Sequence, residues 1–137
     1  MKLLLASFMI ALPILLLTEG YGQGNTTTKK KKPTPKILYG TASFYHDKFN
    51  GRKTANGEIF SQKKMTAACN VLPLGTWIKV TNLRNGKWVY VKTNDRLHPR
   101  MKRLVDLSRI AAKKLGYTGH GLARVKVEVL GKKMPAG

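Results

Sequence analysis

Glu58 and Asp95 are the residues of this chain best suited to acid–base chemistry. Residues 37–130 contain 18 Lys or Arg but only five Asp or Glu, so each acid that lies in a turn calls for a structural or functional explanation. Glu58 ends the segment Thr-Ala-Asn-Gly-Glu and Asp95 lies within Thr-Asn-Asp-Arg, two polar segments between apolar ones. Catalytic groups tend to lie in loops held by a rigid scaffold, where one carboxyl can act as acid and then as base. We therefore expect these two carboxylates to form the centre of a functional site.

Each acid also has a purely structural interpretation. Asp95 follows Asn94 and can be a turn residue that binds its own backbone. Glu58 follows Asn-Gly and can be an exposed loop charge. Asp106 precedes a predicted helix, where an acid suits the helix dipole, and we expect a structural role for it.

Three residues near the two carboxylates are candidates for contacting a substrate. Arg96 follows Asp95, and its guanidinium fork can bind a carboxylate or phosphate, although a plain ion pair is equally open. Tyr45 ends an apolar and aromatic segment, where it can pack in the core or contact a ligand. Asn94, beside Asp95, is the third candidate.

Cys69 is the only cysteine of the chain, so it cannot form an internal disulfide, and a metal site built on cysteine pairs is excluded. Beside two alanines it is more typical of a small buried hydrophobic residue than of a nucleophile paired with a histidine. The three histidines, His46, His98 and His120, show no ligand spacing with one another. We expect no metal and no cofactor, and we assign no site role to the histidines.

The composition of the ends differs from that of the centre and divides the 137 residues into four parts. Residues 1–22 have the positive start and apolar run of an export signal. The run Leu3–Leu17 spans roughly 22 Å, short of the ~30 Å hydrocarbon core, so we expect no stable membrane span, with an uncleaved anchor as the alternative. No cysteine follows the run, and the signal is therefore not evidently that of a lipoprotein. Residues 23–36 are expected to be a disordered basic linker, 37–130 one folded domain and 131–137 a polar tail.

Short strands dominate the expected domain. Asn85-Gly86 between β-rich segments is a strong hairpin signal, and residues 122–130 alternate apolar and charged positions as a half-buried strand does. One helix is expected between Ser108, which can cap it, and Gly116, which can end it. This pattern indicates a mainly β protein built as a small barrel. The expected strands are residues 37–45, 65–69, 77–83, 87–93 and 122–130.

The order of these motifs resembles that of the rare lipoprotein A (RlpA-like) double-psi β-barrels. The resemblance rests on eight motifs in register, which begin with Gly-Thr-Ala-Ser-Phe-Tyr at 40–45 and Phe-Asn-Gly-Arg-Lys-Thr-Ala-Asn-Gly-Glu at 49–58. The others are Leu-Pro-Leu-Gly-Thr at 72–76, Val-Thr-Asn-Leu at 80–83, Asn-Gly at 85–86, Asn-Asp-Arg at 94–96, Val-Asp-Leu-Ser at 105–108 and Ala-Ala at 111–112. The resemblance implies a six-stranded double-psi β-barrel over residues 37–130, with one or two short helices.

In its enzymatic members the resemblance implies endolytic cleavage of peptidoglycan glycan strands between MurNAc and GlcNAc. A lytic transglycosylase protonates the leaving oxygen, and the sugar's own C6 hydroxyl attacks C1 to give a 1,6-anhydro end. By position, Asp95 matches the aspartate implicated in catalysis and Glu58 the turn glutamate. We assign Asp95 as acid and base and Glu58 as the second carboxylate. Surrounding cations favour an ionised carboxylate, whereas a general acid must hold its proton. A second carboxylate nearby raises the pKa, so we expect Asp95 and Glu58 to face one groove.

The sequence departs from the family pattern at three places. Ser61 stands where the family has an aspartate, Cys69 stands where it has a histidine, and Leu-His-Pro at 97–99 replaces Gly-Pro-Phe. Related expansin-like barrels bind and loosen polysaccharide walls with little or no hydrolysis. A non-catalytic polysaccharide-binding barrel is therefore the alternative function.

The net charge of +20 would by itself suggest a nucleic-acid partner. The export signal and the lack of an interleaved aromatic and basic recognition motif argue against specific nucleic-acid binding. We expect a monomer that acts on peptidoglycan glycan strands, exported to the periplasm or cell envelope. Trp77 and Trp88, in or beside the predicted hairpin, are expected to pack in the core, with stacking of one of them on a sugar ring as the alternative.

Overall fold

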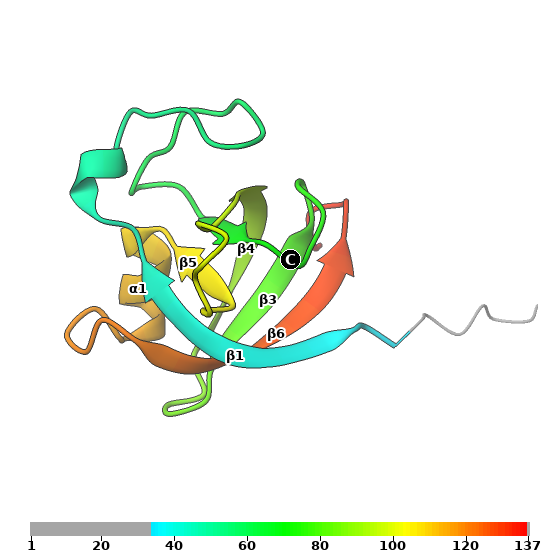
Figure 1. The fold of residues 1–137 in the computed structure, drawn as a ribbon. Helices are drawn as coiled ribbons and strands as arrows, with labels where there is room; N and C mark the ends of the chain where they lie inside the picture. The colour runs from blue at the N-terminus through cyan, green and yellow to red at the C-terminus, as the bar shows by residue number, and fades with distance from the viewer. Residues whose placement is uncertain (1–33, 137) are drawn as a thin grey trace, which may run out of the picture. The chain divides into compact units, whose positions relative to one another are not determined.

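The computed structural model describes residues 34–136, and within them six strands close into a barrel (Figure 1). Around the barrel the strands follow the order β1-β5-β2-β4-β3-β6, which confirms the predicted six-stranded barrel. The predicted signal and most of the predicted linker lie outside the described residues. The strands are β1 (Ile37–Phe44), β2 (Thr66–Cys69), β3 (Trp77–Asn82), β4 (Trp88–Asp95), β5 (Val105–Leu107) and β6 (Ala123–Gly131), and the helices are the 3-10 turn η1 (Asp47–Phe49) and α1 (Arg109–Leu115).

Five of these strands lie on the segments predicted from the sequence, whereas β5 and η1 were not predicted. β5 has only three residues, and it pairs in parallel with β1, where Ala42 lies opposite Val105. Such a strand is defined by partners far away in the chain rather than by a local pattern, because parallel pairing requires a long crossover.

The main core fills the barrel and consists of the inward-facing residues, which alternate with outward-facing ones along each strand. Ile78 and Val80 of β3 and Val125 and Val127 of β6 are fully buried. Their neighbours along each strand point outward, as the two-residue period of a strand requires. Trp88 occupies one of these outward positions and is 50% exposed, so the expectation that it packs in the core is wrong.

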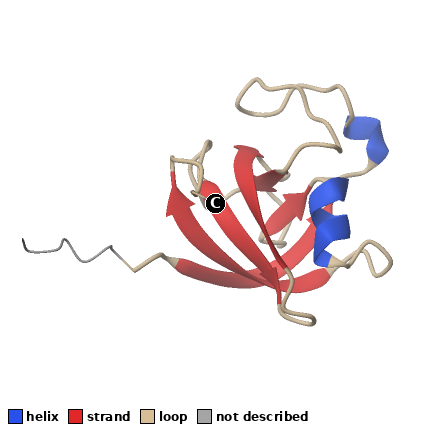
Figure 2. Ribbon diagram, turned by 180° about the vertical axis from the view of Figure 1, so that it is seen from behind, coloured by secondary structure: helices blue, strands red, loops and turns tan. Residues whose placement is uncertain are grey.

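The helix α1 is capped differently from the expectation. Ser108 does occupy the N-cap position, but its side chain makes no capping hydrogen bond. Instead, Oε1 of the buried Gln62 accepts the N–H of Arg109 at 2.7 Å. Gly116 ends the helix as predicted, with a φ of 79° that favours glycine. Figure 2 shows α1 and η1 on the same side of the barrel, and in residues 34–136 no helix is long and apolar enough to cross a membrane.

Strand register places four residues side by side near one end of the barrel. Ser43 of β1 pairs with Asp106 of β5, Asp106 pairs with Ala68 of β2, and Ala68 pairs with Asp95 of β4. The small Ala68 thus separates two acids that lie two strands apart, roughly 10 Å at the usual strand spacing. This row forms the base of the candidate site.

The loop between β4 and β5 lies against β1 at Gly40. A Cβ atom at Gly40 would come within 2.6 Å of Cβ of Leu104, so the close approach requires glycine. The N–H of Leu104 also donates to the carbonyl of Thr41 at 2.9 Å. These contacts fix the end of the loop that carries Arg96 and Arg103.

Candidate functional site

A cleft of about 680 Å³ opens above the row of paired residues. Its walls come from the end of β1, η1, the end of β4, the loop between β4 and β5, and β5 itself. A concave, largely apolar site with a few converging polar groups is the usual form of a ligand-binding site. Its lining residues are Phe44, Tyr45, His46, Lys48, Phe49, Ala68, Asp95, Arg96, Leu97, His98, Met101, Arg103 and Asp106.

Asp95, the last residue of β4, lines this cleft as a fixed carboxylate. Its Oδ2 accepts the hydroxyl of Tyr45 at 2.6 Å, and its Oδ1 accepts the N–H groups of Ala55 and Arg96, each at 2.9 Å. Of these three bonds, only the one from the N–H of Arg96 is a local backbone bond of the kind expected if Asp95 is simply a turn residue. The other two come from distant segments and fix the direction of the carboxylate, as a reacting group requires.

Tyr45 supports Asp95 from an aromatic cluster that is separate from the main core. Its ring stacks on Phe60, with centroids 4.0 Å apart, and meets Phe49 edge to face at 5.8 Å. Ala68 and Leu97 complete the cluster. Burial, together with the hydrogen bond to Asp95 and its charge, raises the pKa of Tyr45 above its ordinary value of 10.0. The hydroxyl therefore stays protonated and donates to Asp95.

Asp106 is the second carboxylate of the cleft, although it was not predicted as a site residue. It lies within β5 rather than at the helix N-terminus, so the expected helix-dipole role does not describe its contacts. Both of its oxygens are bound by Arg103, from Nε to Oδ1 at 2.9 Å and from Nη2 to Oδ2 at 3.1 Å. This bidentate pair raises the pKa of Arg103 and holds one cation beside one acid at the cleft wall.

Glu58 does not line the cleft, so the structure does not bring it into the groove of Asp95 as expected. Its Oε1 accepts Nζ of Lys92 at 2.9 Å and Nδ2 of Asn56 at 2.7 Å, and its Oε2 accepts Nδ2 of Asn94 at 3.3 Å. The bond from Lys92, followed by that from Asn56, lowers the pKa of Glu58 to about 2. Glu58 is therefore ionised at neutral pH and cannot donate a proton there.

The turn that carries Glu58 nevertheless reaches Asp95 through its backbone. The N–H of Thr54 donates to the carbonyl of Glu58 at 2.7 Å, and the N–H of Ala55 donates to Asp95. The same turn is tied to the end of β4, because the N–H of Asn56 donates to the carbonyl of Asn94 at 3.1 Å. Glu58 and Asp95 are thus connected through one turn without sharing one cavity.

The two other predicted contact residues also make bonds within the protein. Asn94 is buried, does not line the cleft and donates to Glu58. Arg96 lines the cleft, but its Nη1 donates to the backbone carbonyls of Cys69 and Leu72. These two bonds are neither the substrate contact nor the ion pair considered from the sequence; they tie the loop after β2 to the end of β4.

Two histidines without a predicted role line the cleft. Nδ1 of His46 accepts the N–H of Lys48, and Nδ1 of His98 accepts the N–H of Arg100, each at 3.2 Å. A neutral histidine bound in this way carries its proton on Nε2, which is then the donor left for a ligand. The one signal in the sequence that could have indicated them was proximity, since His46 follows Tyr45 and His98 closely follows Asp95.

Cys69 is fully buried in the main core, and burial raises the pKa of its thiol. This burial confirms its interpretation as a small buried hydrophobic residue. In residues 34–136, no group of three His, Cys, Asp or Glu side chains is placed to hold a metal ion. The described cleft therefore offers two carboxylates, two imidazoles and one buried phenol for acid–base and hydrogen-bonding chemistry.

Comparisons with known proteins extend over most of this barrel. A family model described as "Lytic transglycolase" matches residues 38–127. The endolytic peptidoglycan transglycosylase RlpA of Pasteurella multocida is 52% identical over 110 residues, which cover 80% of this chain and 37% of that protein. The protein of the same name from Haemophilus influenzae is 44% identical over 109 residues, covering 80% of this chain and 38% of that protein. The chain thus spans less than two fifths of the length of these two relatives.

Solved structures of low sequence identity share the fold. The Streptomyces papain inhibitor aligns with a TM-score of 0.58 at 20% identity, over 72% of this chain and 97% of that chain. The Clavibacter michiganensis expansin aligns with a TM-score of 0.56 at 22% identity, over 74% of this chain and 53% of that chain. At this identity, the likeness shows the fold alone.

Proposed function

Because the chain belongs to the lytic transglycolase family of RlpA-like double-psi β-barrels, we propose that it is an endolytic lytic transglycosylase of peptidoglycan. It would cut glycan strands between MurNAc and GlcNAc and leave 1,6-anhydro ends. The single observation that carries this proposal is the carboxylate of Asp95, oriented by three donors, two of them from distant segments, at the wall of a large cleft. The substrate follows from the relatives, whose names give peptidoglycan.

Asp95 would transfer the proton in both halves of the reaction. It first gives a proton to the glycosidic oxygen, so that the bond between this oxygen and C1 of the sugar breaks. The C6 hydroxyl of the same sugar then attacks C1, and its proton returns to the Asp95 carboxylate. No water is consumed, and one carboxyl serves as acid and then as base.

Asp106 would be the second acidic group in contact with the sugar. It lies two strands from Asp95 in the same row, with only the methyl group of Ala68 between them. Positive charge develops at C1 and the ring oxygen in the transition state, and a nearby carboxylate stabilises it. Arg103 fixes the direction of Asp106, and Nε2 of His46 and His98 would donate to substrate oxygens.

Glu58 and Tyr45 would act on Asp95 rather than on the sugar. Glu58, whose pKa is lowered by Lys92, holds the turn whose Ala55 N–H donates to Oδ1 of Asp95. The hydroxyl of Tyr45 holds Oδ2 of the same carboxylate. Both are positioning residues in this proposal. Arg96 and Asn94, which support the surrounding backbone, have the same kind of role.

In this role the protein would act as a monomer in the cell envelope, where peptidoglycan lies. A digest of purified peptidoglycan, with and without stem peptides, tests it when mass spectrometry follows the 1,6-anhydro ends. The wild-type chain should release them and the Asp95→Asn variant should not. Absence of these ends from the wild-type digest of both substrates would refute the enzymatic proposal.

A non-catalytic wall-binding barrel remains the second candidate because of one specific observation. Cys69, which stands where the family pattern has a histidine, is buried in the core and contributes no group to the cleft. The same digest separates the two functions. Wild-type protein that co-sediments with peptidoglycan but forms no 1,6-anhydro ends would be a binding module.

A further inference from the structure

The outer face of the four strands β4, β3, β6 and β1 carries aromatic side chains that the proposed reaction does not use. Trp88 and Tyr90 are two residues apart on β4 and therefore point to the same side. Trp88 is 50% exposed, and Tyr39, on β1, is 63% exposed. Exposed aromatic groups of this size that gather on one surface usually mark an interaction site. We call the following residues the outer aromatic face: Ile37, Tyr39, Lys79, Thr81, Trp88, Tyr90, Lys126 and Glu128.

Strand register makes this face continuous. One row runs from Trp88 through Thr81 and Lys126 to Tyr39. The next row runs from Tyr90 through Lys79 and Glu128 to Ile37. Each row crosses three strand spacings, or roughly 14 Å, which is wide enough to receive more than one sugar ring.

The Trp88 ring of the face is held in place by its neighbours. The Trp88 and Tyr90 rings lie with centroids 5.0 Å apart and an interplanar angle of 58°. Nζ of Lys79 lies 4.4 Å from the centroid of the Trp88 ring, in a cation–π contact. A platform that is ordered before binding loses little conformational entropy when a ligand packs on it.

The charges of the face are sparse and mixed in sign. Nζ of Lys126 pairs with Glu128 at 3.3 Å, and Nζ of Lys79 lies over the Trp88 ring. With two lysines and one glutamate, the face offers few cations to the closely spaced phosphates of a nucleic acid, whose affinity depends on many such contacts. A mostly uncharged sugar chain with occasional carboxylates needs few cations, and its apolar ring faces can pack on the aromatic groups.

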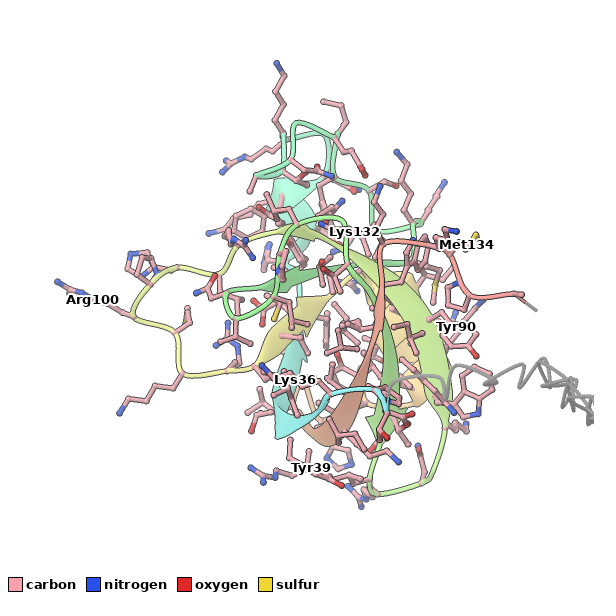
Figure 3. The ribbon with its side chains drawn as sticks, turned by 90° about the vertical axis from the view of Figure 1, so that its right-hand side faces the viewer. Lys36, Tyr39, Tyr90, Arg100, Lys132 and Met134 are labelled. Carbon is pink, nitrogen blue, oxygen red and sulfur yellow. The ribbon has the colours of Figure 1, made fainter. Side chains whose placement is uncertain are left out.

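We infer that the outer aromatic face is a second binding site for a glycan strand, in which sugar rings stack on Trp88 and Tyr90 and Lys79 faces the carboxylates of the strand. Figure 3 shows Tyr90 on one side of the barrel and Arg100, in the loop that lines the cleft, on the other. The two surfaces are thus separate. The identity of the polymer rests on the proposed function, whereas the location of the site rests on the face itself.

Sedimentation with purified, stem-peptide-free peptidoglycan tests this site. Every protein is the full chain with Asp95→Asn, so that cleavage does not alter the polymer during the assay. Adding Trp88→Ala and Tyr90→Ala should weaken binding by roughly tenfold. The matched control is Val71→Ala, which shortens an exposed aliphatic side chain outside both the face and the cleft. Equal affinity of the double variant and the control would overturn the inference.

Tryptophan fluorescence provides a test without alanine substitutions, because the chain contains only two tryptophans. With Trp77→Phe the emission comes from Trp88, and with Trp88→Phe it comes from Trp77. Soluble glycan fragments should change the emission of Trp88 more strongly than that of Trp77. A change confined to Trp77 would place the ligand elsewhere and contradict the stacking on Trp88.

A single-stranded DNA oligomer serves as the competing probe. Loss of DNA affinity with full retention of glycan affinity in the double variant would make the face a nucleic-acid surface and overturn the inference. Failure of the proposed function gives a different result: the wild-type chain would form no 1,6-anhydro ends, while glycan binding would still depend on Trp88 and Tyr90.

Discussion

The hydroxyl of Tyr45 donates a 2.6 Å hydrogen bond to Oδ2 of Asp95 and so joins the end of β1 to the end of β4. The two residues are 50 positions apart in the sequence. Tyr45 is itself fixed by its stacking on Phe60 and by Nε2 of Gln62, which donates to its carbonyl at 2.7 Å. The packing of the aromatic cluster therefore contributes to the direction of the Asp95 carboxylate, together with the N–H groups of Ala55 and Arg96.

Tyr45→Phe should lower the turnover number while leaving KM nearly unchanged. The variant keeps the ring and its packing but leaves Oδ2 of Asp95 without its donor, at a cost of about 1–2 kcal/mol in folding free energy. Initial rates of 1,6-anhydro end formation across a pH series measure the effect, and the pH profile should shift because the bond partner of Asp95 is lost. Tyr117→Phe is the matched control, because it also removes one hydroxyl hydrogen bond, to the carbonyl of Ser43 at 2.8 Å, from a tyrosine that does not line the cleft. An unchanged rate and pH profile would show that the hydroxyl does not position Asp95.

Asp95→Asn and Asp106→Asn should each reduce turnover by roughly a hundredfold or more, as expected for loss of an acid–base group or of a charge that stabilises the transition state. Asp47→Asn is the control, because Asp47 is an exposed acid that pairs with Arg109. Mass spectrometry of the digest measures all three. Full activity of Asp106→Asn would remove it from the proposed mechanism.

Glu58→Gln should destabilise the protein at neutral pH but not in strong acid. The folded-state pKa of Glu58 is about 2, against an ordinary value of 4.5. Its stabilising effect is therefore fully present above pH 4.5 and disappears as the pH falls through about 2. Urea unfolding of both proteins at several pH values should show a difference that shrinks from pH 6 to pH 2. A constant difference over this range would contradict the depressed pKa.

Gln62→Ala should lower the folding free energy by about 2–4 kcal/mol, because it removes three hydrogen bonds of a buried side chain, one of them to the carbonyl of the buried Tyr45. The side chain of Gln62 binds the carbonyl of Tyr45, the carboxylate of Asp47 and the N–H of Arg109. Gln62→Glu retains the acceptor for Arg109 but loses the donor, so the two variants separate helix capping from support of Tyr45. Thermal unfolding measures stability, and α1 should remain intact in Gln62→Glu. Equal stability of Gln62→Ala and the wild type would show that these bonds contribute little.

The parts of the fold that could be predicted are those with a local cause. Asn85-Gly86 predicted a hairpin, and Gly86 adopts a φ of 75° in the turn between β3 and β4. The alternation of apolar and charged residues predicted β6, and the glycine after α1 predicted the end of the helix. β5 could not be predicted, since its pairing with β1 and β2 depends on the closed barrel.

The candidate site shows the same division. Asp95 and Tyr45 were proposed from the sequence and do meet in the cleft. Asp106 was missed because an acid two residues before a helix cap has an ordinary local explanation. The position of Glu58 could not be derived either, because Lys92, which holds it away from the cleft, is 34 residues distant.

The aromatic cluster of Tyr45, Phe60, Ala68 and Leu97 is separate from the core that fills the barrel. Small packing units of this kind open at a lower free energy than the whole domain. Activity should therefore be lost on heating before the barrel melts, and amide hydrogens around Phe60 should exchange sooner than those of β6. An organism that adapts this barrel to colder or warmer conditions could do so by substitutions in these few residues, while the strands and their register stay the same.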